Sequence, residues 1–210
     1  MITLKQALEM SYEEYVSHLL KKYGPAKANY FLNENCKSKG KISRTKEGLE
    51  CHHIDEDKEQ LLSDPRIAVI NPFEYQKANR LVYCDKVEHL LIHIKIIEEF
   101  RPQNEWYKYY MDGPRMIISC INDYFKDDII STSWHGNMKQ KIIPKFNSYI
   151  FILFYILFNL AQTKISSNNI LDLVLVSYYG RADKRISLAL EKLTKIENHN
   201  EILNSTEIDL

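Results

Sequence analysis

The sequence predicts a mainly helical α+β protein that contains one small strand–loop–strand–helix unit. Three observations lead to this fold class. Apolar residues recur at helical spacing on both sides of the unit. Two short runs with strand-like composition lie at 48–54 and 80–84, and a helix-capping pattern follows the second run directly. We therefore expect a helical segment over 1–48, the unit over 49–100 and a helical region over 101–210.

The first long helix is expected over 12–23, because Ser11 and Glu14 have capping-box spacing and apolar residues follow at helical intervals. Gly24 and Pro25 end this helix and allow a second one up to about Phe31. Two helices joined by a tight turn are typical of a DNA-reading helix-turn-helix, but an ordinary helical hairpin has the same pattern. The pattern alone favours the ordinary hairpin.

In the central unit, the run 48–54 is expected to pair with 80–84 across a long acidic loop that contains Pro65 and Pro72. Asp85 has the position of an N-cap and Glu88 that of the third helical residue, so a helix should run to about Phe100.

Beyond the unit, helices are expected near 114–126, 146–162, 168–179 and 182–197, with turns at 134–137, at 166–169 and at Gly180. The apolar run Tyr149–Phe158 is shorter than the about 20 residues that a membrane-crossing helix needs. We expect it to be a buried core helix, with half of a homodimer interface as the alternative.

The composition is that of a folded and electrically balanced protein. Of 210 residues, 45% are hydrophobic and 27% are charged, far from the composition of disordered chains. Because 28 basic side chains are balanced by 28 acidic ones, a globally basic nucleic-acid-binding protein is excluded. The four cysteines form no C-x-x-C pair, and the N-terminus lacks the pattern of a signal peptide, so we expect reduced thiols and a cytoplasmic location.

Basic residues gather in one segment, 37–46, directly before the first strand of the unit. Its members are Lys37, Lys39, Lys41, Arg44 and Lys46. A short charge run is commonly a solvated loop, but it can also supply phosphate contacts if nucleic acid binds nearby.

Four histidines of the central unit are candidates for chemistry. His89 and His93 are four residues apart on the expected helix, so both can reach one metal ion, and both lie outside its apolar stripe. His52 and His53 are adjacent on a strand, so their side chains point to opposite faces. Either pair alone is commonly an unremarkable surface pair, but the two pairs together indicate a metal site with one histidine left free as a base.

These residues resemble the HNH family of endonucleases. The resemblance covers 49–94 and rests on Glu50-Cys51-His52-His53, on Asn79 before the second strand, and on His-x-x-x-His in the helix, which is most similar to the colicin-type members. It implies a ββα-metal finger in which His52, His89 and His93 bind one divalent ion. It further implies His53 as general base, Asn79 as the residue that holds the loop and orients the base, and Glu50 as a supporting residue.

The chain departs from the family where Asp55-Glu56-Asp57 follow the histidine pair, in place of Pro or Gly. This acidic stretch could bind a second cation or repel nonspecific DNA, but a solvated loop is the simpler expectation.

The resemblance implies a metal-dependent endonuclease that acts on double-stranded DNA. Because the helices outside the finger supply enough protein to read a sequence, we expect a site-specific enzyme of restriction-like or phage/homing type. A homodimer is a further expectation, since one active site per chain cuts one strand. A neutral imidazole can accept the proton of a water molecule at neutral pH, and a divalent ion can stabilise charge on the phosphate. Mg²⁺ or Mn²⁺ is the expected ion, with Zn²⁺ or Ni²⁺ as alternatives. The residues of the segment 37–46 and Arg80 are the expected phosphate contacts. The alternative is a noncatalytic, metal-stabilised module that binds nucleic acid or protein.

Overall fold

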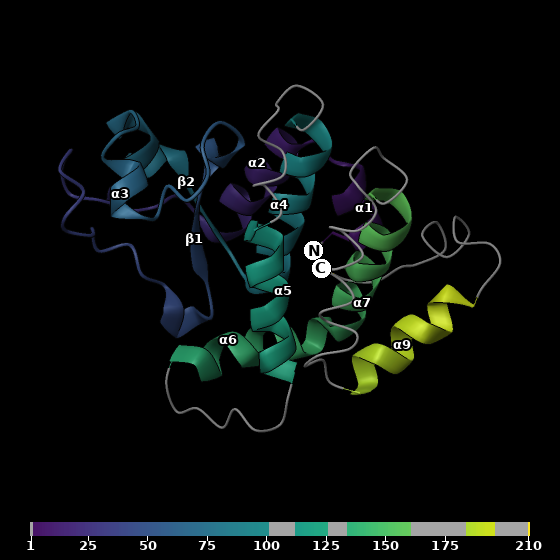
Figure 1. Ribbon diagram of the computed structural model, residues 1–210. Coiled ribbons are helices and arrows are strands. Elements are labelled where there is room, and N and C mark those ends of the chain that lie inside the picture. The colour runs from purple at the N-terminus through teal and green to yellow at the C-terminus, as the bar shows by residue number, and fades with distance from the viewer. Residues whose placement is uncertain (1, 101–111, 126–133, 161–183, 196–209) are drawn as a thin grey trace.

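The computed structural model describes residues 2–100, 112–125, 134–160, 184–195 and 210, and it has the predicted class, mainly helical with one small antiparallel sheet (Figure 1). The helices are α1 (Leu4–Glu9), α2 (Tyr12–Tyr23), α3 (Pro65–Ala68), α4 (Lys86–Phe100), α5 (Asp112–Phe125), α6 (Trp134–Ile142), α7 (Phe146–Tyr155) and α9 (Lys184–Thr194). The sheet pairs β1 (Glu50–His53) with β2 (Leu81–Cys84).

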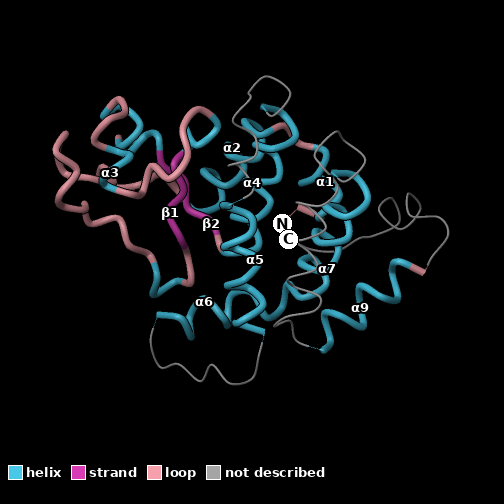
Figure 2. The backbone as a smooth tube through the Cα atoms, in the orientation of Figure 1, coloured by secondary structure: helices cyan, strands magenta, loops and turns pink. Residues whose placement is uncertain are grey.

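The predicted hairpin of the central unit is confirmed. β1 and β2 are antiparallel, with Glu50 opposite Cys84 and His53 opposite Leu81. The chain between them forms α3 and short 3-10 turns. Figure 2 shows the loops of this region gathered on one side of the strands and the long helices on the other.

The predicted cap of α4 is also confirmed, and it fixes where the helix starts. Asp85 Oδ1 accepts hydrogen bonds from the backbone N–H of Val87 at 2.9 Å and of Glu88 at 3.0 Å. In return, the backbone N–H of Asp85 donates to Glu88 Oε2 at 2.8 Å. This reciprocal capping box sets the rotation of α4, and with it the direction of the histidines one and two turns later.

The start of the chain agrees with the prediction in one helix and differs in the next. Ser11 and Glu14 form the predicted capping box at the start of α2. The predicted second helix up to Phe31 is wrong, because the backbone of Tyr30 is used in other contacts: its N–H donates to Gln76 O at 2.8 Å and its carbonyl accepts from Gly40 N at 2.7 Å. Those bonds compete with helical ones, so residues 24–31 are not helical and a helix-turn-helix is not formed there.

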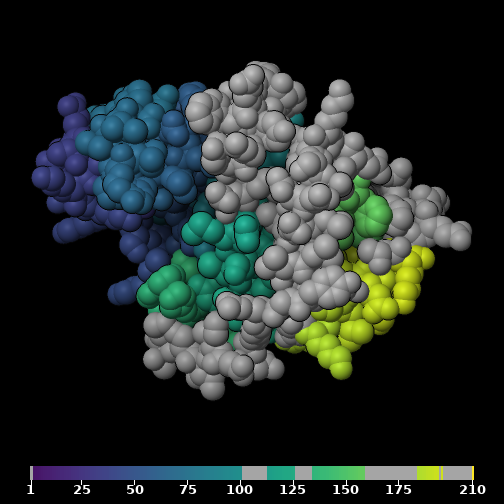
Figure 3. Space-filling model, in the orientation of Figure 1, coloured from purple at the N-terminus to yellow at the C-terminus, as the bar shows by residue number. Residues whose placement is uncertain are grey.

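Two apolar clusters lie on the two sides of the sheet. The larger surrounds α4, whose buried face packs against α2, α5, α6 and α7. The smaller lies under the loops on the far side of the sheet and includes Tyr30, Phe31, Leu81 and Tyr83. In Figure 3 the region of these loops forms the blue end of the molecule. The sheet is therefore buried on both sides.

The C-terminal region contains one further error of prediction. Residues 134–137, expected to form a turn, begin α6. Met138 and Ile142, four residues apart, are buried on one face of α6, and the His135 ring contacts the Tyr124 hydroxyl at 2.8 Å. Tertiary packing thus overrides the turn propensity of Gly136. Helices α5 and α9 lie within a few residues of the predicted ranges, whereas 168–179, 166–169 and Gly180 lie outside the described residues.

The apolar run Tyr149–Phe158 forms α7 and the beginning of a π-helix, Ile156–Leu160. Tyr149 and Phe154 are fully buried in the core of this chain, as the core-helix expectation requires. The longer helical stretch Trp134–Phe158 has the length and hydropathy of a membrane-crossing helix, with 44% of its most apolar window buried. The core helix of a water-soluble protein meets the same criteria, so this stretch does not establish a membrane location.

Candidate metal centre

Three of the four predicted histidines converge at the interface of β1 and α4. One ring nitrogen from each of His52, His89 and His93 lies within 4.8 Å of the others, so these residues could hold a metal ion. His52 Nδ1 and His89 Nε2 are 3.2 Å apart. The three ring centroids are separated by 5.0 to 5.2 Å. The predicted grouping of the three ligands is therefore present in the fold.

Hydrogen bonds from outside the cluster engage the outward nitrogens of two of these rings, whose inward nitrogens face each other. His89 Nδ1 contacts Glu50 Oε2 at 2.9 Å, and Glu50 Oε1 pairs with Lys86 at 2.7 Å. Tyr12 donates its hydroxyl proton to Ile54 O, so at 3.5 Å from His52 Nε2 it can only accept. Both contacts fix the tautomer in which the nitrogen facing the cluster has a lone pair.

The electrostatics of the cluster favour uncharged ligands. Burial and the neighbouring His89 lower the pKa of His52 and of His93 well below the ordinary histidine value. Burial alone would raise the pKa of Glu50, but the hydrogen bond from His89 and the charge of Lys86 outweigh it and lower this pKa to about 2. Glu50 is thus ionised, and it supports the His89 ligand from behind.

Gly113 of α5 limits the space of the His93 ring, and no sequence pattern indicated this contact. A Cβ at this position would lie 2.7 Å from His93 Cε1 and 2.8 Å from Nδ1. Any side chain there would push the ring away from its place.

We predict that Gly113→Ala weakens metal binding about tenfold. Substitution of a residue that contacts and orients a metal ligand typically lowers metal affinity 10- to 100-fold. The measurement is a metal titration of wild type and variant. Circular dichroism is the control, because alanine is a better helix former than glycine and should preserve α5. Unchanged affinity would show that the His93 ring adapts freely.

His53 points away from the three ligands, as adjacent strand residues must. Its side chain is buried under the Tyr30 ring, with ring centroids 4.4 Å apart. His53 Nε2 contacts Gln76 Oε1 at 3.0 Å, while the amide nitrogen of Gln76 donates to Leu62 O at 3.2 Å. This arrangement places the ring proton on Nε2 and leaves a lone pair on Nδ1. Burial lowers the pKa of His53 to about 4, so the ring is neutral at pH 7.

The contact that orients His53 therefore comes from Gln76 and not from Asn79. The side chain of Asn79 is exposed on the 3-10 turn Ala78–Arg80 and makes no hydrogen bond to His53. The fold delivers Gln76 instead because the 3-10 turn Phe73–Gln76 lies against residue 30, whose N–H binds the Gln76 carbonyl.

The acidic stretch after β1 is not the solvated loop that was expected. A 3-10 turn, Ile54–Asp57, folds it back toward the histidines. Asp55 is 1% exposed, and its carboxylate is bound by Arg80 and Lys58. Glu56 Oε2 lies 3.6 Å from His52 Nδ1 and 3.6 Å from His93 Nε2. Glu56 Oε1 lies 4.0 Å from His53 Nδ1.

The predicted phosphate contacts divide into two groups. Arg80 is held by Asp55 at 2.6 Å, Arg44 by Glu47 at 2.7 Å, and Lys39 by the Tyr30 hydroxyl at 3.0 Å. The other three side chains are exposed and form no ion pair with another described residue. They are Lys37, Lys41 and Lys46. Only this second group is free to meet a phosphate without breaking an existing contact.

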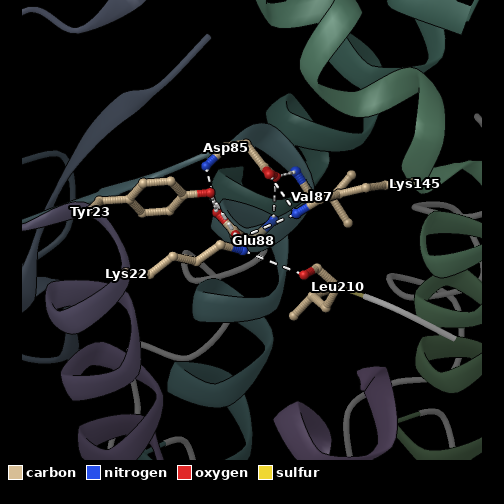
Figure 4. A network of polar contacts seen from close by, with 7 residues as sticks. All are labelled: Lys22, Tyr23, Asp85, Val87, Glu88, Lys145 and Leu210. Carbon is tan, nitrogen blue, oxygen red and sulfur yellow. Dashed lines mark hydrogen bonds and ion pairs between the residues drawn. The ribbon is translucent and has the colours of Figure 1, made fainter. Parts of the chain in front are cut away.

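A buried polar network anchors the start of α4, one residue before the first helical ligand (Figure 4). Lys22 Nζ lies 2.6 Å from Glu88 Oε1, and Tyr23 donates its hydroxyl to Glu88 Oε2 at 2.9 Å. Lys145 Nζ pairs with Asp85 Oδ2 at 2.6 Å and also reaches Glu88 Oε1 at 3.3 Å. The network connects α2 and the turn before α7 to α4, so it holds the ligand-bearing helix in place.

No protein-family model matches the chain, and no curated protein and no solved structure is similar to it at a significant level.

Proposed function

We propose that this protein is a metal-dependent DNA endonuclease of the HNH type, with His52, His89 and His93 as metal ligands and His53 as general base. One observation carries the proposal. Two adjacent residues of β1 have separate environments. His52 joins two helical histidines in a cluster of ring nitrogens, whereas His53 is kept neutral by burial and its ring is oriented by Gln76. A phosphodiester hydrolase needs this division between a cation and a base.

The chain's own groups would divide the work as follows. The bound ion would supply Lewis-acid stabilisation of the charge on the scissile phosphate. His53 would accept a proton from the attacking water at Nδ1, while Gln76 keeps the ring proton on Nε2. Glu50 would hold His89 in its ligating orientation.

The donor set bears on which ion is bound. Three imidazole nitrogens suit transition ions such as Mn²⁺, Zn²⁺ and Ni²⁺ better than Mg²⁺, which prefers oxygen ligands. Among the proposed ions we therefore expect Mn²⁺ to bind more tightly than Mg²⁺.

Plasmid cleavage tests the activity. Purified protein is incubated with supercoiled plasmid and, in separate reactions, Mg²⁺, Mn²⁺, Zn²⁺ or Ni²⁺, with a chelator as the control. Nicked or linear product that depends on an added ion supports the proposal, and sequencing of the ends tests whether cleavage is site-specific. Intact plasmid with all four ions would overturn it.

The exposed lysines of the segment 37–46 are proposed to contact the DNA backbone. They precede β1 directly, and Lys39 of the same segment reaches Tyr30, which packs on His53. Near them is a cavity of about 630 Å³, whose lining includes Tyr23, Lys27, Lys41 and Arg44. Charge of this kind steers a phosphate backbone toward a site without reading its sequence.

We predict that replacing Lys37, Lys41 and Lys46 by glutamine weakens DNA binding and reduces the slope of log affinity against log salt. Each lost phosphate contact should change the slope by about 0.9. The measurement is fluorescence anisotropy of labelled DNA over a salt series. A matched variant replaces exposed basic residues of α2, α5 and α9, namely Lys21, Arg115 and Lys192. Equal slopes for the two triple variants would exclude a special role for the segment.

A noncatalytic, metal-stabilised module is the second candidate, and burial of the histidines favours it. His52 is 2% exposed and His53 1% exposed. Structural metal sites are closed in this way, whereas catalytic sites keep a position open for substrate. Such a module would gain thermal stability from the metal and would leave the plasmid intact.

A further inference from the structure

Glu56 is the one carboxylate among the described residues that reaches both a β1 and an α4 histidine of the cluster. Its Oε2 is equidistant, at 3.6 Å, from His52 Nδ1 and His93 Nε2. His52 Nδ1 is also the nitrogen that lies 3.2 Å from His89 Nε2. No lysine or arginine ion pair is formed by this carboxylate within the described residues. Its carboxylate accepts a backbone hydrogen bond from Leu62, and its other polar contacts are to His52, His53 and His93.

The separations match those of ligands around one ion. Four ligands at the usual Zn²⁺ bond lengths of about 2.0–2.1 Å, in a tetrahedron, are about 3.3–3.4 Å from one another. The His52–His89 nitrogen pair is 3.2 Å apart, and Glu56 is 3.6 Å from the ligand nitrogens of His52 and His93. Three edges of the group thus lie within a few tenths of an ångström of the ideal edge.

The anchoring of Asp55 sets the position of Glu56. Asp55, the residue before it, is buried and bound by the guanidinium of Arg80 and by Lys58. The 3-10 turn Ile54–Asp57 then places the next side chain, Glu56, toward β1 and α4. Burying a carboxylate charge next to neutral imidazoles is costly, and a cation bound between these groups would offset that cost.

We propose that Glu56 is a fourth ligand of the metal centre, which then has three imidazoles and one carboxylate. The proposal rests on the metal centre of the proposed function and does not need the nuclease activity. It also accounts for the role of the acidic stretch after β1. Asp55 anchors the turn, and Glu56 supplies a negative charge that an ion held by three neutral histidines alone would lack.

A metal titration of the full chain tests this ligand. Wild type, Glu56→Gln and Glu74→Gln are stripped with a chelator and titrated with Zn²⁺ and with Mn²⁺ against a chromophoric competitor. Glu74 is exposed on the loop side of the sheet and serves as the matched control. We expect Glu56→Gln to bind at least tenfold more weakly than wild type, because a charged ligand outweighs the 10- to 100-fold of a supporting residue. Glu74→Gln should bind like wild type.

The visible spectrum of the Co²⁺-loaded protein is the second measurement. A four-coordinate Co²⁺ absorbs strongly and a six-coordinate one weakly, so loss of Glu56 should change band intensity and position. Glu56→Asp keeps the negative charge on a shorter side chain, and it is the second variant in case Glu56→Gln does not fold. It should bind the metal with an affinity between those of wild type and Glu56→Gln.

The outcomes separate the two proposals. Equal affinity and an identical Co²⁺ spectrum for wild type and Glu56→Gln would overturn the fourth ligand, and faster plasmid cleavage by that variant would indicate that Glu56 occupies the place of the phosphate. Absence of metal binding by wild type would overturn the centre itself. Metal binding that depends on Glu56, without any cleavage, would overturn only the nuclease.

Discussion

Replacing His53 by alanine is expected to lower the rate of plasmid cleavage by roughly 10²- to 10⁴-fold, the usual contribution of a general base. The reason lies in the separation of His53 from the metal ligands. Its Nδ1 has a lone pair, and its Nε2 is held by Gln76 at 3.0 Å, so it is placed to accept a proton and not to bind the ion. Metal affinity should therefore stay close to that of wild type.

The measurement pairs cleavage kinetics with a metal titration of the same preparations. Gln76→Ala should reduce the rate by a smaller factor, because it removes the residue that orients the ring. Asn79→Ala is the matched control, since Asn79 is exposed and does not contact His53. Full cleavage by His53→Ala would exclude the proposed base. If Asn79→Ala lost as much cleavage rate as Gln76→Ala, the assignment of Gln76 as the residue that orients His53 would be contradicted in favour of Asn79.

Replacing Lys145 by methionine is expected to lower the free energy of unfolding by about 3–5 kcal/mol. Lys145 pairs with Asp85 at 2.6 Å and with Glu88 at 3.3 Å, and both carboxylates are fully buried. Without it, Glu88 keeps Lys22, but Asp85 has no cationic partner among the described residues, and this leaves uncompensated buried charge. For a chain of 210 residues this corresponds to a fall in the unfolding temperature of roughly 10 °C.

Urea unfolding with and without the substitution is the measurement. Arg66→Met is the matched control, because Arg66 pairs with Asp64 on the surface, where such pairs contribute at most about 1 kcal/mol. A loss in Lys145→Met no greater than that in Arg66→Met would show that the network does not stabilise the fold.

One member of this network, Glu88, makes a contribution to the pH dependence of stability whose sign follows from the direction of its pKa shift. Burial raises the pKa of Glu88, but Lys145 and Lys22 outweigh it, and the net shift is downward. A carboxyl group whose pKa is lower in the folded state stabilises the fold above the ordinary carboxyl pKa, and this stabilisation is lost as the pH falls through the lowered value. Glu88→Gln should therefore show a weaker dependence of the unfolding free energy on pH in the acid range.

The local parts of the candidate site could be predicted from the sequence. A capping box depends on residues three positions apart, so Asp85 and Glu88 were sufficient to predict the start of α4. Helical periodicity put His89 and His93 on one flank, and the alternation of a strand separated His52 from His53. The three candidate metal ligands could be named in advance because each of these relations is set by the backbone of a single element.

The tertiary structure alone decided which residues surround those histidines. Gln76, Glu56 and Gly113 reach the site through a loop, a 3-10 turn and a separate helix, and no sequence spacing relates them to His53 or His93. The same long-range pairing prevented a helix at residue 30, whose backbone binds Gln76 and Gly40 instead. The sequence by itself determined the helical class, the hairpin and the face of its element on which each clustered histidine lies, because those depend on local periodicity. Packing decided that Gln76 contacts His53, that Glu56 lies beside the histidines and that Arg80 binds Asp55. The reason is that a buried polar group takes the partner that the folded chain places beside it.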